Sequence, residues 1–141
     1  MTSRVAAVQP VEVERQQVRV MYMRAPEDTP FAIQNAWAKF ERVVGLKGRK
    51  FYGTFDVGTR EYRVCTELQP GDDPERLGLE VAILPGGKYL RARLQGDPPA
   101  VYRKIPVTFQ QLVKTSTSDP SRPSIEFYRS RDVIDLLLPV I

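Results

Sequence analysis

The sequence predicts a single α+β domain, residues 1–141, in which a strand–helix–strand–strand unit occurs twice as a pseudo-twofold duplication. A polar stretch rich in proline and glycine, residues 69–78, indicates a linker between a first half at about 9–68 and a second half at 79–141. Either half alone would leave one sheet face bare. We therefore expect one antiparallel sheet with two helices on one face and a ligand groove on the other. Matching residues also recur at a constant offset: Pro30 with Pro99, Phe40 with Phe109, Val43 with Leu112 and Val44 with Val113.

The first half begins with a strand, because apolar and other side chains alternate over residues 18–23. Thr29 is a suitable N-cap before Pro30, and Gly45 suits the end of a helix, so a helix is predicted between them. Residues 50–55 and 61–68 follow as two strands joined by a turn. The apolar stripe of the helix recurs at three- and four-residue spacing and comprises Ile33, Ala36, Trp37, Phe40, Val43 and Val44.

The second half repeats this pattern. Residues 79–84 and 88–95 are predicted strands around a turn at Pro85 and Gly86. A second helix is expected to begin near Ile105, because Pro106 is tolerated only in a first turn. A polar, proline-containing loop leads to two closing strands between Pro123 and Val140.

Glu126 is the first candidate functional residue, because it is a carboxylate in the middle of an apolar and aromatic strand. Side chains alternate across a strand, so Glu126 shares a face with Tyr128 while Ile125 and Phe127 point the other way. If Ile125 and Phe127 pack on the core, Glu126 and Tyr128 line the opposite face. A desolvated carboxylate there is costly unless something pairs with it. The alternative at this point is that Glu126 simply faces water.

The residue types that are missing exclude several kinds of catalytic and metal-binding site. The chain has no histidine and one cysteine, Cys65, which excludes imidazole bases, histidine-containing metal sites and an intramolecular disulfide. No phosphate-binding or dinucleotide-binding glycine motif is present, and we expect no cofactor and no metal. Any catalysis must use carboxylates, tyrosines, lysines or Cys65, and Cys65 itself is expected to be a small buried residue.

Charge and hydropathy bear on partners and compartment. The net charge of +4 comes from scattered basic residues, without the dense stripe that marks a nucleic-acid groove. No apolar run is long enough to span a membrane, and the first residues lack the apolar core of a secretory signal. We therefore expect a cytoplasmic protein that binds neither nucleic acid nor membrane directly.

Several local patterns together resemble the gyrase-inhibitor-like (GyrI-like) small-molecule-binding domain. That domain is also the effector module of multidrug-responsive AraC-type and MerR-type transcription regulators. The resemblance spans roughly residues 9–141. It rests on the order and spacing of "QQVRVMYMRA", "AW" followed by Phe40, "YG" at Tyr52, "YRVC" at Tyr62, "LPGGKYLRARLQG" and "IEFYRS" followed by "DLLLPV".

The resemblance implies a stand-alone ligand-binding module with an acidic and aromatic pocket. The family's pocket acid lies in a Glu-x-Tyr pattern on the penultimate strand, which corresponds to Glu126 with Tyr128 here. Trp37 also has a core-packing alternative, and Phe109 is expected in the core. The remaining ligand-binding candidates that the family motifs suggest are Tyr52, Tyr62, Tyr89 and Trp37.

Three functions remain open on the sequence alone. The first is binding of an aromatic or lipophilic small molecule at Glu126. The second is hydrolysis of strained electrophilic molecules, as some GyrI-like proteins perform, with Glu126 as general acid or base and Tyr128 as a partner. The third is a protein-binding role, with a regulator or gyrase as partner, which would survive mutation of Glu126. Arg91 and Arg93 alternate with Tyr89 on one strand face, and would favour an anionic ligand if they faced the groove.

Overall fold

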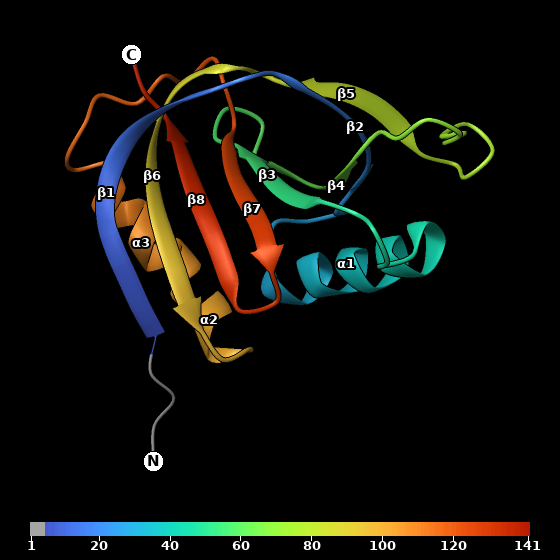
Figure 1. Cartoon of the computed structure of the whole chain (residues 1–141), viewed down its shortest axis with the longest axis horizontal. Helices are drawn as coiled ribbons and strands as arrows, with labels where there is room; N and C mark the ends of the chain where they lie inside the picture. The colour runs from blue at the N-terminus through green and yellow to red at the C-terminus, as the bar shows by residue number, and fades with distance from the viewer. Residues whose placement is uncertain (1–4) are drawn as a thin grey trace.

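The protein is an α+β fold built on one antiparallel sheet of eight strands in the order β1-β6-β8-β7-β3-β4-β2-β5 (Figure 1). The computed structural model describes residues 5–141. The strands are β1 (Val5–Arg15), β2 (Val18–Arg24), β3 (Phe51–Asp56), β4 (Glu61–Glu67), β5 (Glu80–Leu84), β6 (Gly87–Gly96), β7 (Ser124–Ser130) and β8 (Val133–Pro139). The helices are α1 (Pro30–Val44), α2 (Ala100–Arg103) and α3 (Ile105–Leu112).

The order of the strands is the same from either end of the sheet when β1–β4 are matched with β5–β8. β7 and β3 meet at the centre, and β1 and β5 form the two edges. Each edge strand pairs with the other set, because β1 pairs with β6 and β5 pairs with β2. An internal duplication would give this order, but the duplication itself stays a prediction.

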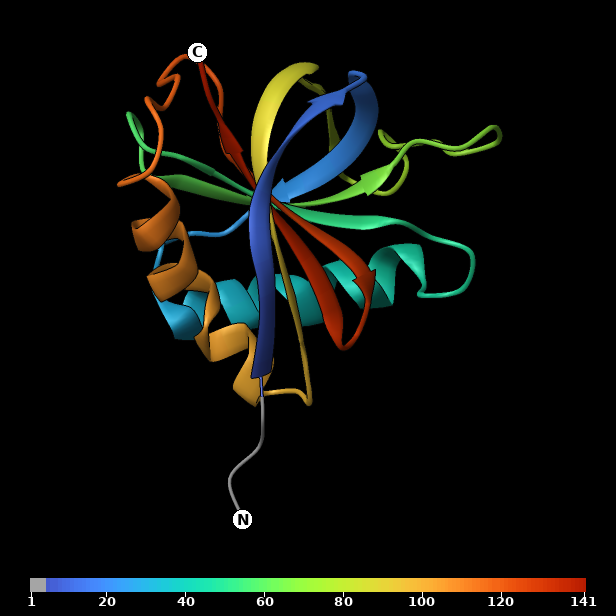
Figure 2. The same cartoon turned by 60° about the vertical axis from the view of Figure 1, so that its left-hand side comes forward.

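Both helical regions lie on one face of the sheet. Directly paired residues share a face, and one such row runs Ala92, Leu136, Glu126, Gly53 and Val64 across the sheet. At one end of this row Ala92 and Leu136 pack with residues of α2 and α3. At the other end Val64 packs with residues of α1. Figure 2 shows the two helical regions on the same side of the sheet.

The sequence-based placement of the groove on the face away from the helices is therefore wrong for Glu126. Glu126 and Gly53 occupy the middle of the row on the helix face, between the two regions that the helices cover. Strand alternation established correctly that Glu126 and Tyr128 share a face. It did not reveal which face carries the helices, because Ile125 and Leu137 of the opposite face are also buried in an apolar cluster.

Helix α1 begins and ends where the sequence predicts. The Thr29 hydroxyl accepts a hydrogen bond from the Ala32 backbone N–H at 3.3 Å, and Pro30 occupies the first turn. Gly45 ends the helix with a φ of 78°, which glycine adopts without a steric penalty. Phe40, which is fully buried, anchors the helix to β2 and β4, and such a side chain contributes about 1.5–3 kcal/mol through burial.

The second helical region is divided into two segments. The predicted start at Ile105 is confirmed for α3, and Pro106 lies in its first turn. The short α2 was not predicted, because four residues are too few to show helical periodicity. Val113 lies just beyond α3 and is half exposed, so it does not extend the buried stripe.

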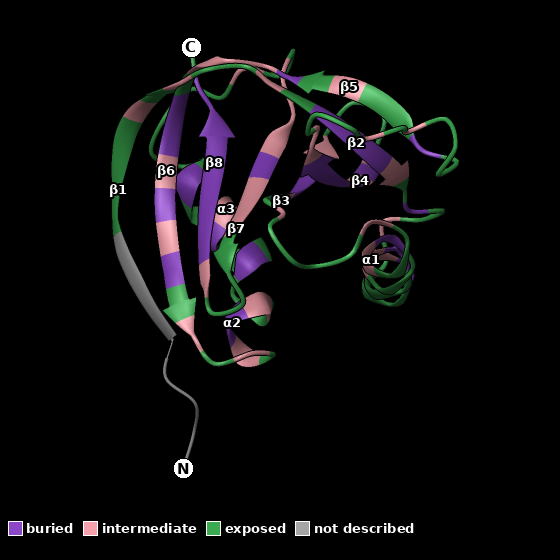
Figure 3. Cartoon of the chain, turned by 45° about the vertical axis from the view of Figure 1, so that its right-hand side comes forward, coloured by how far each residue is buried: buried purple, intermediate pink, exposed green. Residues whose placement is uncertain are grey.

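An inner strand of the sheet is more buried than an edge strand (Figure 3). β8 is buried along most of its length, whereas the edge strand β5 is largely exposed. The strand predicted at residues 18–23 is β2, and an additional strand, β1, precedes it and ends at Arg15. No helix within residues 5–141 has the length and apolar character needed to cross a bilayer.

Candidate functional site

Glu126 lies at the centre of a hydrogen-bonded cluster on the helix face. The Tyr62 hydroxyl of β4 donates to its Oε1 atom at 2.8 Å, and the Tyr128 hydroxyl donates to the same atom at 2.7 Å. Among the described residues, Glu126 forms no ion pair and its Oε2 atom accepts no hydrogen bond. The carboxylate is thus held through one oxygen, and the other oxygen has no partner among the described residues.

The Oε2 atom of Glu126 remains reachable from solvent. Every fully buried side-chain oxygen or nitrogen within residues 5–141 has a hydrogen-bond partner, and Oε2 has none. Glu126 as a residue is only partly exposed. The arrangement is a recessed carboxylate with one open lone-pair direction.

Aromatic rings from both halves surround this carboxylate. The Trp37 indole of α1 donates to the Tyr62 hydroxyl at 3.2 Å and contacts the Tyr128 ring edge-on at a centroid distance of 5.1 Å. The ring of Tyr102 in α2 also meets Tyr128, at a centroid distance of 6.1 Å, and Phe51 of β3 meets Trp37 at 6.1 Å. Helices from both halves therefore bring aromatic side chains to one acid on the sheet.

The absence of a side chain at Gly53 makes room for the cluster. Gly53 lies directly opposite Glu126 in the β3–β7 pair and opposite Val64 in the β3–β4 pair. A Cβ atom at this position would lie 2.7 Å from Glu126 Oε1 and would overlap the Tyr62 hydroxyl. The hydroxyl and the carboxylate meet in the space above the glycine backbone.

The electrostatics follow from burial. Burial raises the pKa of the Glu126 carboxyl above its usual value, and the hydrogen bonds from Tyr128 and Tyr62 offset part of that rise. Burial, followed by the nearby charge of Glu126, raises the pKa of Tyr62 and Tyr128 well above the ordinary value for tyrosine. Both tyrosines therefore remain protonated donors at neutral pH.

The structure brings together four of the six residues that the sequence suggested: Glu126, Tyr128, Tyr62 and Trp37. Trp37 also packs against the core of the first half, so its two interpretations are compatible. Tyr52 and Tyr89 lie in the buried cluster on the opposite face of the sheet.

These two tyrosines have structural contacts there. Tyr52 stacks on Phe127 at a centroid distance of 4.9 Å, and the Tyr89 hydroxyl donates to the Pro85 carbonyl at 2.6 Å. Neither residue joins the Glu126 cluster.

Arg91 and Arg93 also lie on the face away from Glu126, as the alternation with Ala92 requires. Arg93 donates to both carboxylate oxygens of Asp135, through Nε at 2.6 Å and through Nη2 at 3.1 Å. Arg129 approaches the same carboxylate at 3.5 Å. This face therefore has its own ion-pair network, and the arginines place no positive charge beside Glu126.

Sequence reasoning did not identify Gly53, Phe51 or Tyr102 as parts of the site. For Gly53 a signal existed, because a glycine inside a strand often marks the close approach of another group. Phe51 and Tyr102 carry no such signal, since aromatic residues in strands and helices usually pack in a core. Their role follows only from the β3–β7 pairing and from α2.

The cluster can bind a cation or accept a proton. An open carboxylate oxygen among aromatic faces suits a cationic group through charge and cation–π contact. The same oxygen, with a raised pKa, also suits proton transfer. Within residues 5–141, no group of three or more histidine, cysteine, aspartate or glutamate residues is placed to hold a metal ion.

Comparison with protein-family models and with curated proteins finds no match. Among solved structures, an integron cassette protein from the mobile metagenome of Vibrio cholerae is similar, with a TM-score of 0.78 and 18% identity over 97% of this chain and 99% of that one. SAV2435, solved bound to tetraphenylphosphonium, has a TM-score of 0.64 and 14% identity over 95% of this chain and 94% of that one. A hydrolase from Listeria innocua has a TM-score of 0.53 and 11% identity over 94% and 91%. At these identities the likeness concerns the fold, and it is consistent with the GyrI-like ligand-binding fold that the sequence resembles.

Proposed function

We propose that this protein is a GyrI-like, internally duplicated module that binds lipophilic organic cations with aromatic groups at Glu126. The observation that carries the proposal is the state of the Glu126 carboxylate. It is recessed among aromatic rings, braced at Oε1 by two phenols, and without a cationic partner among the described residues. A carboxylate in this state gains most from a ligand that brings a positive charge.

The fold comparison supports the class of ligand. SAV2435, which shares this fold, was solved with tetraphenylphosphonium, a cation surrounded by aromatic rings. In the present chain, Trp37, Tyr62 and Tyr128 would contact the rings of such a ligand, and Glu126 Oε2 would face its charge. The two tyrosines hold the carboxylate in place before the ligand arrives, which reduces the ordering cost of binding.

The test uses two probes of nearly equal shape and opposite charge, the tetraphenylphosphonium cation and the tetraphenylborate anion. By isothermal titration calorimetry we expect the cation to bind and the anion to bind far more weakly. Glu126→Gln removes the charge but keeps an oxygen that accepts from Tyr62 and Tyr128. It should weaken cation binding by at least tenfold, because a desolvated charge pair contributes about 2 kcal/mol or more.

A control variant separates the site from general hydrophobic binding. Glu67→Gln makes the same change on β4, two strands away from β7, where Glu67 is paired only with Lys50 at 4.0 Å. This variant should bind the cation as the wild type does. Equal binding of both probes, or an unchanged affinity in Glu126→Gln, would contradict the proposal.

Hydrolysis is a second candidate, favoured by one observation. Glu126 combines a raised pKa with an open Oε2 atom, as a general base that activates water requires. A similar fold occurs in the hydrolase from Listeria innocua. Turnover of an epoxide such as styrene oxide to its diol, lost in Glu126→Gln, would establish this second function, and stoichiometric binding without turnover would favour the first.

A further inference from the structure

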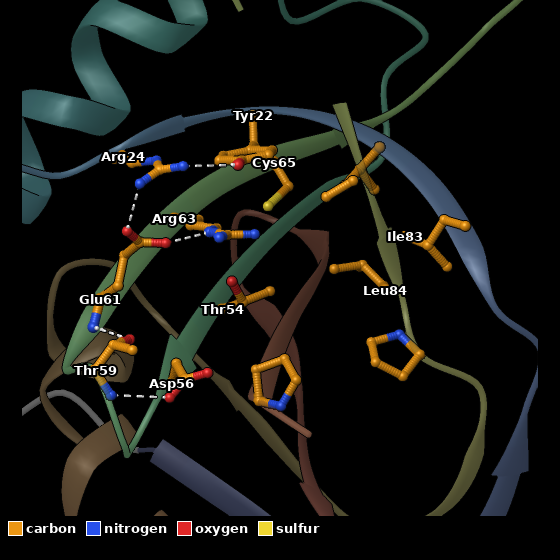
Figure 4. A pocket seen from close by; sticks show the side chains of 14 residues that line it. Tyr22, Arg24, Thr54, Asp56, Thr59, Glu61, Arg63, Cys65, Ile83 and Leu84 are labelled. Atoms are coloured by element: carbon orange, nitrogen blue, oxygen red, sulfur yellow. Dashed lines mark hydrogen bonds and ion pairs between the residues drawn. The ribbon is translucent and has the colours of Figure 1, made fainter. Parts of the chain in front are cut away.

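A pocket of about 370 Å³ lies on the face of the sheet opposite Glu126 (Figure 4). It is formed by β2, β3, β4 and β5 together with Pro123. Strand alternation separates it from the cluster described above, because Tyr62 points to the helix face while Glu61 and Arg63 point into the pocket. Its volume lies within the range of small-molecule sites.

The polar end of the pocket contains four charged side chains, of which Arg24 and Glu61 are paired with protein groups. Arg24 donates through Nε and Nη2 to Glu80 and through Nη1 to Glu61. Glu61 also accepts at its second oxygen from Arg63 Nε at 2.5 Å. Arg24 and Glu61 are therefore committed to one another and to their neighbours.

Arg63 and Asp56 keep unused groups. Among the contacts of residues 5–141, Arg63 donates only through Nε, which leaves its two terminal amino groups without a protein acceptor. Stacking on the Tyr22 ring, with the guanidinium carbon 4.3 Å from the ring centroid, holds this guanidinium in place. Asp56 accepts one bond, from the Thr59 backbone N–H to Oδ1 at 3.0 Å, and its Oδ2 atom has no partner within the described chain.

Arg63 and Asp56 are diagonal neighbours on two adjacent strands. Thr54 lies directly opposite Arg63 in the β3–β4 pair, and Asp56 lies two residues further along β3. Diagonal neighbours of this kind are about 7–8 Å apart along the sheet, and Arg63 and Asp56 form no ion pair within 4.0 Å. In Figure 4, Thr54 lies between them and both side chains point toward the pocket.

We propose that this pocket binds a small zwitterion of the amino-acid type that carries an apolar substituent. The carboxylate of the ligand would take the two free amino groups of Arg63 in a bidentate contact, and its ammonium would face Asp56 Oδ2. The apolar substituent would lie toward Ala82 and Leu84 of β5, which also line the pocket.

The charge of the lining favours a neutral zwitterion over a simple ion. Two guanidinium groups, Arg24 and Arg63, face two carboxylates, Asp56 and Glu61, so the charges of the lining residues cancel. A simple anion would pair with Arg63 but be repelled by Asp56. A simple cation would pair with Asp56 but be repelled by Arg63. Only a ligand with both charges uses both free groups.

Three probes that share a phenylethyl group test the proposal on the wild-type protein: L-phenylalanine, 3-phenylpropanoate without the ammonium, and 2-phenylethylamine without the carboxylate. By calorimetry or ligand-observed NMR we expect L-phenylalanine to bind at least tenfold more tightly than either of the others. This comparison needs no variant and therefore does not depend on how a mutation affects folding. Equal affinities for the three probes, or no saturable binding of L-phenylalanine up to about 10 mM, would overturn the proposal.

Variants then locate the contacts. Arg63→Gln and Asp56→Asn should each weaken L-phenylalanine binding about tenfold or more, and Asp56→Asn keeps an oxygen for the Thr59 N–H. If Arg63→Gln does not fold, Arg63→Lys retains the charge but removes the bidentate contact and should also weaken binding. Arg60→Gln is the matched control, because Arg60 pairs with Asp28 outside the pocket lining.

A final comparison separates this pocket from the Glu126 site. Glu126→Gln should bind L-phenylalanine as the wild type does, and tetraphenylphosphonium should not displace it. Loss of L-phenylalanine binding in Glu126→Gln, with full binding in Arg63→Gln, would assign the amino acid to the helix face and reject a second site.

Discussion

At the scale of single residues, Glu126 is a carboxylate whose neighbours support two protonation states. The hydroxyls of Tyr62 and Tyr128 donate to the ionised form and stabilise it, whereas burial favours the neutral form. Burial is the larger effect, so the pKa of Glu126 lies above the usual value of 4.5. A bound cation would reverse the balance, because it stabilises the ionised form.

Cation binding should therefore depend on pH in a range above that of an exposed glutamate. We expect the affinity for tetraphenylphosphonium to fall as the pH drops through the raised pKa of Glu126, by up to about tenfold per pH unit. Calorimetric titrations between pH 4 and pH 8 would measure this. In Glu126→Gln the affinity should be low and flat with pH, and a midpoint at or below 4.5 in the wild type would contradict the raised pKa.

The same shift affects stability with the opposite sign. The raised pKa means that the contribution of Glu126 to folding is fully present below pH 4.5 and is lost as the pH rises through the folded-state value. The free energy of unfolding of Glu126→Gln, from urea denaturation, should therefore equal or exceed that of the wild type at neutral pH. The advantage of the variant should shrink as the pH is lowered through this window.

At the scale of elements, strand β3 determines whether the site can form. β3 pairs with β4 on one side and with β7 on the other, so Glu126 lies directly opposite Gly53 and Tyr62 lies diagonally across from it on the same face. Phe51, two residues away on the same face, contacts both Trp37 and Phe40 of α1. One strand thus aligns the acid, the phenol and the helix.

Gly53→Ala tests this alignment. The added methyl group would lie 2.7 Å from Glu126 Oε1 and overlap the Tyr62 hydroxyl, so it would force the pair apart. We expect a loss of about 1–3 kcal/mol in the free energy of unfolding, together with loss of tetraphenylphosphonium binding. Gly58→Ala is the control, because a Cβ atom there meets only Asp56 Oδ1, at 3.2 Å, and full cation binding by Gly53→Ala would refute the alignment.

The sequence predicted most of these elements, and its errors have a common cause. Residues that act within one element gave clear signals: Thr29 and Gly45 bounded α1, and alternation paired Glu126 with Tyr128. What remained unpredicted depends on contacts between elements. Tyr52 and Tyr89, like Tyr62, are tyrosines in strands with similar local sequence. Their side chains point to the other face of the sheet, because the direction alternates from one residue to the next.

At the scale of the whole molecule, the two halves are joined by more than the central contact between β3 and β7. β1 precedes the first helix yet pairs with β6, and β5 precedes the second helix yet pairs with β2. Each half therefore contributes an edge strand to the other. Neither half can keep its complete sheet when the other unfolds, so the molecule should unfold in one step.

Leu112→Ala tests this coupling. Trp37 is the single tryptophan and packs in the core of the first half, with a ring contact to Tyr128 of β7. Leu112 is 1% exposed in the core of the second half, and its truncation should cost about 2–5 kcal/mol. In a one-step transition, the denaturation midpoint followed by Trp37 fluorescence should fall as far as the midpoint followed by circular dichroism. Leu46→Ala, at a residue 62% exposed, should leave both midpoints unchanged. A Trp37 midpoint that stays in place in Leu112→Ala while the circular dichroism midpoint falls would mean that the halves unfold independently, and that the exchanged strands do not couple them.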